Sequence, residues 1–159
     1  MTILRGHEDR VTSAAFSPDG RYILTTSYDK TARLWDKQGK LLTVLRGHEG
    51  QINSAVFSPD GQRTVTFGFE KSARLWDRQG KLLKVLQGHK GNLRRAIFSP
   101  DGRQILTISG DEADRTVRLW DSQGQLLKVL QGHENSITDA GFSPDGQCIL
   151  TASVVSIFS

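Results

Sequence analysis

Residues 6–45 read GHEDRVTSAAFSPDGRYILTTSYDKTARLWDKQGKLLTVL, and the 159-residue chain repeats this stretch with small changes. The dipeptide Gly-His stands at residues 6–7, 47–48, 88–89 and 132–133, so the repeat is 41 residues long twice and then 44. All four histidines lie in Gly-His, all four prolines in FSPDG, and all three tryptophans in LWD. Because the rarest residues recur in register, the sequence indicates an array of four repeats, of which the last is truncated.

Each repeat divides into four short segments of β-character, separated by turns. In the first repeat these segments are residues 11–16, 21–27, 31–36 and 40–45, which are rich in β-branched, aromatic and small apolar side chains. In the turn SPDG at 17–20, proline presets one backbone angle and glycine accepts a left-handed conformation. No window places apolar residues at the helical period over a helix length, so the sequence predicts an all-β fold.

Composition excludes several classes of protein. Hydrophobic residues make up 36% of the chain, which approaches the average globular share. No apolar run approaches the roughly 18 residues that a membrane-spanning helix needs, and the N-terminus lacks the apolar core of a signal peptide. The single cysteine, Cys148, can form no internal disulfide. We therefore expect a cytoplasmic location.

Four motifs recur in one register: Gly-His, FSPDG, the aspartate of the turn after the second segment, and LWD. Together they resemble the WD-repeat β-propeller family, whose blades have four antiparallel strands and whose repeats span roughly 40–45 residues. The repeated pattern of FSPDG followed by LWD is similar to the WD repeats common in bacterial, especially cyanobacterial, proteins. The resemblance covers essentially the whole chain. It implies about 3.5–4 blades per chain, as a partial propeller or as a ring completed by oligomerisation.

The expected organisation is a single array over residues 1–159. Its repeats are predicted at about 6–46, 47–87, 88–131 and 132–159, and residues 1–5 match the outer strand of a preceding or closing blade. The last repeat runs out in VVSIFS without a turn aspartate or LWD. Whether residues 154–158 form a third strand there stays open.

The resemblance also implies a hydrogen-bonded tetrad of a histidine, a second-strand serine or threonine, the turn aspartate and the tryptophan. Carried over residue by residue, its members are His7, Ser27, Asp29 and Trp35 in the first repeat, His48 and Trp76 in the second, His89, Ser109, Asp114 and Trp120 in the third, and His133 and Ser153 in the fourth. The second repeat has Gly68 and Glu70 where the hydroxyl and the aspartate are expected. Its tetrad is therefore predicted to be incomplete.

Histidine, aspartate and serine are also the residue types of a nucleophilic triad. An active site is needed once, whereas this set recurs in every intact repeat, so the structural interpretation is far stronger. No GxSxG elbow holds any of these serines, and the four histidines lack the short spacing of zinc ligands. The sequence therefore predicts no enzymatic activity, no catalytic residue, no metal site and no cofactor.

Propellers of this family bind peptides or domains on the face that carries the Gly-His loops, so the resemblance implies a protein-interaction scaffold. The implied contact positions lie at the start of the first strand and just before the turn aspartate: Arg10, Thr12, Tyr28, Gln51, Asn53, Phe69, Asn92, Arg94 and Ala113. Two aromatic residues and two arginines among these positions suit an interface. The alternative for each position is ordinary solvated surface.

The net charge of +4 is spread unevenly along the chain. Residues 63–103 contain ten lysines and arginines against three acidic residues, a local charge of +7, and the rest of the chain carries eleven against fourteen. Such a region can steer nucleic acid or an acidic partner. The sequence offers no basic strand with interleaved aromatic residues, so an ordinary solvated face is the stronger interpretation. Nucleic-acid binding through the middle repeats remains the alternative function.

A closed propeller needs about 4–8 blades, and one chain supplies at most about four. Residues 146–159 carry no charge and are strongly β-prone, and an exposed edge of this kind invites pairing with another strand. We therefore expect either a homo-oligomer, with a dimer closing the ring, or a fragment of a longer chain without independent activity.

Overall fold

The computed structural model describes residues 2–154, and every regular element within them is a β-strand. Consecutive strands pair antiparallel and build three sheets of four strands and one of two. The strands are β1 (Val11–Phe16), β2 (Tyr22–Ser27), β3 (Ala32–Asp36) and β4 (Leu41–Leu45) in the first sheet; β5 (Ile52–Phe57), β6 (Arg63–Gly68), β7 (Ser72–Asp77) and β8 (Leu82–Gln87) in the second; β9 (Leu93–Phe98), β10 (Gln104–Ser109), β11 (Val117–Asp121) and β12 (Leu126–Leu130) in the third; and β13 (Ile137–Phe142) and β14 (Ile149–Ser153) in the last.

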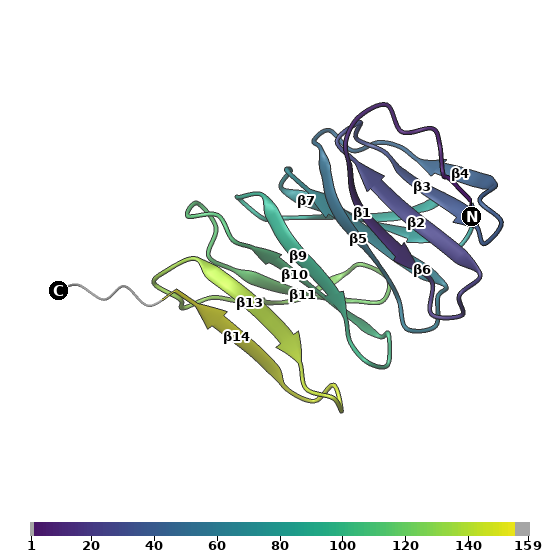
Figure 1. Cartoon of the computed structure of the whole chain (residues 1–159). Coiled ribbons are helices and arrows are strands. Elements are labelled where there is room, and N and C mark those ends of the chain that lie inside the picture. Colours follow the sequence, from purple (N-terminus) through teal and green to yellow (C-terminus); the bar gives the residue numbers. More distant parts are fainter. Residues whose placement is uncertain (1, 155–159) are drawn as a thin grey trace.

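The four sheets stand side by side in a curved row, as the blades of a partial β-propeller (Figure 1). The first strand of one blade lies against the first strand of the next, since β1 contacts β5 and β5 contacts β9. The last blade joins the row through contacts between β10 and β13. The predictions of an all-β fold and of four-stranded blades are confirmed, and the last sheet has two strands within residues 2–154.

Each predicted repeat contains one sheet, and its limits stay a prediction. Residues 2–5 are not in a strand. Thr2 and Leu4 nevertheless lie against Gly39 as Thr43 and Leu45 of β4 lie against Gly80. The N-terminal segment therefore lies beside the first blade as an outer strand lies beside the second. Of the segment 154–158, only residue 154 is among those described, and it is not in a strand.

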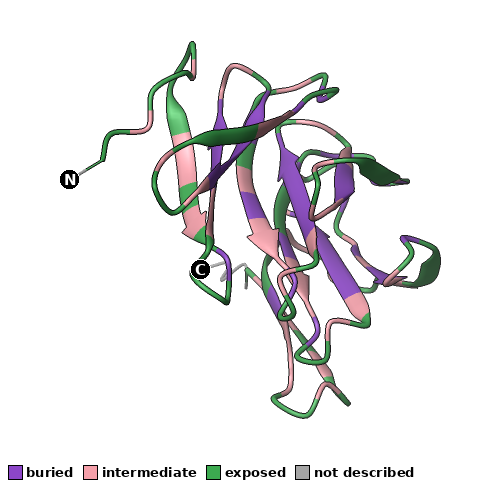
Figure 2. Cartoon of the chain, turned by 90° about the vertical axis from the view of Figure 1, so that its right-hand side faces the viewer, coloured by how far each residue is buried: buried purple, intermediate pink, exposed green. Residues whose placement is uncertain are grey.

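The apolar core lies between the blades, and Figure 2 shows the buried residues gathered in the central strands. Equivalent residues build each junction: Leu24, Ile52 and Trp76 between the first two blades, Val65, Leu93 and Trp120 between the next two, and Leu106 and Ile137 at the third. A blade therefore buries its apolar faces only against its neighbours, as repeat architectures do.

The SPDG turn joins the first two strands of every blade. The Gly20 amide donates to the Ser17 carbonyl at 2.8 Å, and the Ser17 hydroxyl donates to the Asp19 carboxylate at 2.6 Å. Gly20 has a φ of 67°, and its counterparts in the other three turns lie between 66° and 71°. The left-handed glycine predicted for this turn is confirmed.

Candidate functional site

A chain of hydrogen-bonded side chains runs through the first blade. The Trp35 indole donates to Thr25 Oγ1 at 2.9 Å, and Thr25 Oγ1 lies 2.8 Å from His7 Nε2. His7 Nδ1 lies 2.7 Å from Asp29 Oδ2, and the Thr31 hydroxyl donates to the same carboxylate at 2.6 Å. Tryptophan, threonine, histidine and aspartate are therefore linked in series, from β3 through β2 to the loop before β1.

The third blade repeats this arrangement. The Trp120 indole donates to Thr107 Oγ1 at 2.8 Å, which lies 2.8 Å from His89 Nε2, and His89 Nδ1 lies 2.7 Å from Asp114. The three extra residues in the preceding turn therefore leave the hydrogen-bonded chain intact.

The prediction that Ser27 and Ser109 supply the hydroxyl is wrong. Ser27 Oγ donates to the Asp9 carbonyl and Ser109 Oγ to the Asn92 carbonyl, both at 3.1 Å. The physical reason is their position along the strand. Ser27 lies two residues beyond Thr25, roughly 7 Å further from the tryptophan, so only the threonine reaches both rings.

The second blade is also complete, contrary to the prediction from its sequence. Thr66 Oγ1 accepts from the Trp76 indole at 2.8 Å and hydrogen-bonds His48 Nε2. The Glu70 carboxylate replaces the aspartate and hydrogen-bonds His48 Nδ1. Because the hydroxyl comes from Thr66, glycine at position 68 removes nothing from the tetrad.

In the last blade, His133 and Ser153 meet as predicted, but in a different role. His133 Nε2 lies 2.8 Å from the Thr151 hydroxyl, which again takes the bridging position. His133 Nδ1 lies 3.0 Å from Ser153 Oγ. A serine hydroxyl therefore occupies the place that a carboxylate has in the three complete blades.

The bonds around His48 and His89 fit a neutral imidazole. In each blade the indole donates to the threonine, whose hydroxyl can donate to Nε2, and Nδ1–H can donate to the carboxylate. Burial lowers the pKa of His48 and of His89 below the ordinary 6.5. Burial would raise the pKa of Asp29, but hydrogen bonds from Thr31 and His7 outweigh it and hold that pKa well below its usual range. Both nitrogens of each ring are occupied, so the geometry favours a structural role.

A β-bulge interrupts the pairing of the first two strands in each of the four blades, close to the Gly-His loop. The register between β1 and β2 shifts between Val11 and Ser13, so Thr12 is not paired with a residue of β2. The same shift falls at the equivalent residues of the other blades, Asn53, Arg94 and Thr138. Bulges commonly lie next to functional sites because they turn one side chain out of the sheet.

Two aromatic residues from neighbouring blades meet near the Gly-His loops and the bulges. The Tyr28 and Phe69 rings pack edge to face with centroids 6.1 Å apart, and the Arg10 guanidinium lies 5.7 Å from the Tyr28 centroid. Backbone bonds fix both aromatic residues, because the Tyr28 amide donates to Arg10 and the Phe69 amide to Gln51, each at 2.9 Å. Phe69 remains 51% exposed.

Two hollows flank Phe69. One, of about 250 Å³, is lined by Asn53, Phe69, Asn92, Leu93, Arg94, Gly110 and Asp111. The other, of about 570 Å³, is also lined by Phe69 and Asn92 and continues past charged side chains at Glu49, Lys71 and Arg74. Phe69 therefore stands between two recesses that a bound segment could enter.

The structure brings six of the nine predicted contact residues together: Arg10, Tyr28, Asn53, Phe69, Asn92 and Arg94. Gln51 supports Phe69 through its backbone. The Thr12 hydroxyl donates to the Ile52 carbonyl at 2.8 Å and so connects two blades, and Ala113 lies outside both hollows. Partner contact by any of the nine stays a prediction.

Sequence reasoning missed a charged residue of the smaller hollow and the bulge residue of the last blade. Asp111 lines the smaller hollow, and Thr138 stands at the bulge of the last blade. The repeat register could have identified Thr138, because it follows Arg94 by one repeat. Nothing in the sequence identifies Asp111, whose turn is longer than the corresponding turns.

Across residues 2–154, no three side chains of histidine, cysteine, aspartate or glutamate are arranged to hold a metal ion. The same residues contain no helix that is long and apolar enough to cross a membrane.

A family model described as WD domain, G-beta repeat matches residues 1–36, 39–77, 80–121 and 124–154. Ribosome assembly protein 4 of Saccharomyces cerevisiae is 46% identical over 41 residues, which are 25% of this chain and 8% of that protein. WD repeat-containing protein 18 of Homo sapiens is 45% identical over 38 residues, 24% of this chain and 9% of that protein. The chain thus spans less than a tenth of either relative, and the likeness is that of single repeats.

Proposed function

The chain belongs to the WD40 repeat family, and we propose that it is a non-enzymatic scaffold that binds a protein or peptide partner. WD40 repeats generally mediate protein–protein interactions. We place the partner on the aromatic face, defined as Arg10, Tyr28, Asn53, Phe69, Asn92 and Arg94. The observation that carries this choice is the half-exposed Phe69 ring between two hollows, braced by Tyr28 of the neighbouring blade.

The chemistry of the aromatic face favours a segment that offers an apolar side chain to Phe69 and a polar side chain to the charged pair Arg94 and Asp111 of the smaller hollow. Phe69 supplies apolar area, and Arg94 lines the smaller hollow next to it. Aromatic residues and arginine dominate the binding energy of interfaces. Phe69 is held by a backbone bond and by Tyr28, so its ring loses little conformational entropy on binding.

A selection from a random twelve-residue peptide display library tests this proposal. Peptides enriched on the wild-type chain are measured by fluorescence anisotropy against Phe69→Ala and Arg94→Ala. Since loss of a central interface residue costs about 2 kcal/mol or more, each substitution should weaken binding at least about tenfold.

Arg103→Ala is the matched control, because Arg103 is an exposed arginine directly after an SPDG turn, outside the aromatic face. It should leave peptide affinity unchanged. The proposal fails if enriched peptides bind Phe69→Ala and Arg94→Ala as tightly as the wild type, or if no peptide is enriched.

Nucleic-acid binding through residues 63–103 is the alternative, and the structure weakens its basis. Arg74 is buried and donates to the Glu70 carboxylate at 2.7 Å. Arg95 pairs with Asp139, and Arg78 donates to the Tyr22 hydroxyl at 2.8 Å. Part of the local positive charge is therefore engaged within the protein. Binding of a single-stranded oligonucleotide that falls steeply between 50 and 200 mM salt would favour the alternative.

We also propose that the chain works as part of a larger ring, completed by a second copy or by further repeats of a longer chain. The last sheet, which has two strands among the described residues, supports this proposal. A cytoplasmic location likewise remains a proposal; it rests on the one cysteine, which is free and exposed. Cell fractionation with an antibody against the chain would test it.

A further inference from the structure

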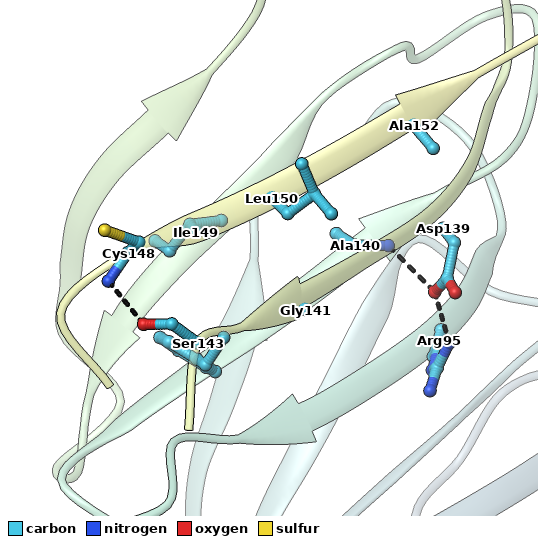
Figure 3. Close-up of a pocket in the computed structure, with 10 residues that line it drawn as sticks. Arg95, Asp139, Ala140, Gly141, Ser143, Cys148, Ile149, Leu150 and Ala152 are labelled. Atoms are coloured by element: carbon cyan, nitrogen blue, oxygen red, sulfur yellow. Dashed lines mark hydrogen bonds and ion pairs between the residues drawn. The ribbon is translucent and has the colours of Figure 1, made fainter. Parts of the chain in front are cut away.

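The last blade exposes an apolar position that every other blade buries. Leu24, Val65 and Leu106 occupy equivalent places in β2, β6 and β10, and each packs in the core against the next blade. Leu150 continues this series in β14 and is 77% exposed. It lines a hollow of about 500 Å³ with Gly141, Cys148 and Ala152 (Figure 3). We call this surface the trailing face.

The first blade exposes the matching surface at the opposite end of the row. Val11 and Phe16 of β1 are 51% and 69% exposed. The counterparts of Val11, which are Ile52, Leu93 and Ile137, are buried. The counterparts of Phe16 are half-buried against the preceding blade. Ala14 is likewise exposed, whereas its equivalents are buried. We call Val11, Ala14 and Phe16 the leading face.

Polar groups on the two faces also match the pattern of the internal junctions. Between the first two blades, Thr12 Oγ1 donates to the Ile52 carbonyl at 2.8 Å, and Ser54 Oγ donates to Ser13 Oγ at 3.3 Å. The equivalents on the trailing face are Thr138, which is exposed, and Asp139, whose carboxylate can accept from a serine. The same geometry would join Thr138 to the carbonyl of Val11 and Asp139 to Ser13 of another copy.

We propose that the trailing face of one copy binds the leading face of a second copy, head to tail, in the geometry of the internal blade junctions. The occupant is a second copy because the chain carries, at Val11, Ala14 and Phe16, the counterparts of the first-strand residues that share a core cluster with Leu24, Val65 and Leu106 in the three internal junctions. In the last sheet β13 and β14 correspond to β1 and β2, and the described residues include no counterparts of β3 and β4. The inference deepens the proposed larger ring by naming the residues that close it.

Two copies together supply enough sheets to close a ring of ordinary size. Each copy supplies four sheets, so two supply eight, at the upper end of the range of about 4–8 blades. A head-to-tail interface closes into a ring when the accumulated rotation is complete. In such a dimer both trailing faces are covered, and neither apolar surface remains in water.

Analytical ultracentrifugation from about 1 to 100 μM tests the proposal with the full chain. The wild type should be a dimer over most of this range. Leu150→Glu and Phe16→Glu should each raise the dissociation constant at least about tenfold, because each places a charge in an apolar junction. Leu127→Glu is the matched control, since Leu127 is a 52% exposed leucine on the outer strand β12. Circular dichroism checks that all three variants keep the β-fold.

A cysteine pair tests the head-to-tail geometry itself. Ser13→Cys and Asp139→Cys are prepared as separate chains, each also carrying Cys148→Ser. The mixture should form a disulfide-linked dimer under mild oxidation, whereas either chain alone should not, because the two positions meet only across copies. Ser13→Cys mixed with Thr43→Cys, on the outer strand β4, is the control.

A wild type that stays monomeric at 100 μM would overturn the proposal and leave the trailing face to further repeats of a longer chain. Dimers that survive Leu150→Glu and Phe16→Glu, or a mixture that fails to cross-link, would also overturn it. Open polymers would exclude closure by two copies. These results are independent of peptide binding at the aromatic face, so failure of the ring and failure of the scaffold function are distinguishable.

Discussion

At the scale of single residues, one threonine hydroxyl in each complete blade lies between the histidine and the tryptophan. Thr25, Thr66 and Thr107 each accept from an indole and contact an imidazole nitrogen. All three threonines are buried, so water cannot replace the hydroxyl. A buried donor or acceptor without a partner carries the full penalty of its desolvation. The threonine is therefore the member of the tetrad whose loss leaves two partners unsatisfied at once.

Thr107→Val should destabilise the protein by about 2 kcal/mol or more, because it leaves the Trp120 N–H and the His89 nitrogen unpaired at nearly constant volume. Urea unfolding followed by tryptophan fluorescence measures the change. Thr43→Val, at a half-buried threonine on the outer strand β4, should change the free energy of unfolding by less than about 0.5 kcal/mol. Equal effects of the two substitutions would contradict the bridging role.

The buried histidines predict a pH dependence of stability with a definite sign. Burial lowers the pKa of His48 and His89 below 6.5 in the folded state. As the pH falls below 6.5, the unfolded chain binds protons that the folded chain does not, so the free energy of unfolding decreases. The contribution of the two neutral histidines to the free energy of unfolding is fully present above pH 6.5. It is lost as the pH falls toward the lowered pKa values of His48 and His89.

Urea unfolding at pH 8, 7, 6 and 5 should therefore show constant stability at the two higher values and a progressive loss at the two lower ones. His48→Gln and His89→Gln each remove one buried imidazole and should flatten the decline below pH 6.5. Stability that is unchanged or that rises between pH 7 and 5 would contradict the prediction.

At the scale of strands and turns, β-bulges and close backbone contacts decide which residue fits at a position. Gly68 ends β6 opposite the bulge of β5. A Cβ atom added there would meet the backbone of Gln51 and lie 2.7 Å from the Asn53 amide nitrogen. Glycine is therefore required by the backbone of this blade and is no defect of its tetrad.

Gly68→Ser restores the residue of the first and third repeats, yet we expect it to destabilise the protein by about 1–3 kcal/mol through overpacking. Gly141→Ala is the control, because no atom lies within 4 Å of the position that its Cβ would take. It should be neutral or slightly stabilising, since alanine is favoured over glycine inside a strand. Thermal unfolding of both variants measures the difference, and a stabilising Gly68→Ser would show that the backbone adjusts freely.

At the scale of the whole molecule, the repeat pattern predicted the architecture but not the contacts between side chains. The register of Gly-His, FSPDG and LWD predicts blades, turns and strand limits, because each motif determines the backbone conformation of its own short segment. Ser27 and Thr25 lie on the same strand face, so only three-dimensional distance shows which one reaches Trp35. The six residues of the aromatic face were implied by family resemblance. These six residues come together because neighbouring blades pack side by side, and the pattern of a single repeat contains no information about that packing.

The row of blades also predicts a gradient of stability along the chain. A blade gains its stability mainly from its neighbours, and a two-stranded hairpin alone is marginal in water. β10 is buried between two neighbouring blades, whereas β14 lies at the edge of the row with Leu150 exposed. In dilute solution, amides of β14 should exchange with deuterium at least about tenfold faster than amides of β10, because local opening of the last blade breaks fewer contacts.

Mass spectrometry of peptides covering 104–109 and 149–153 at about 1 and 100 μM measures both rates. Docking of a second copy should slow β14 at the higher concentration and leave β10 unchanged. Equal rates at 1 μM would mean that the last blade opens only together with the rest of the row.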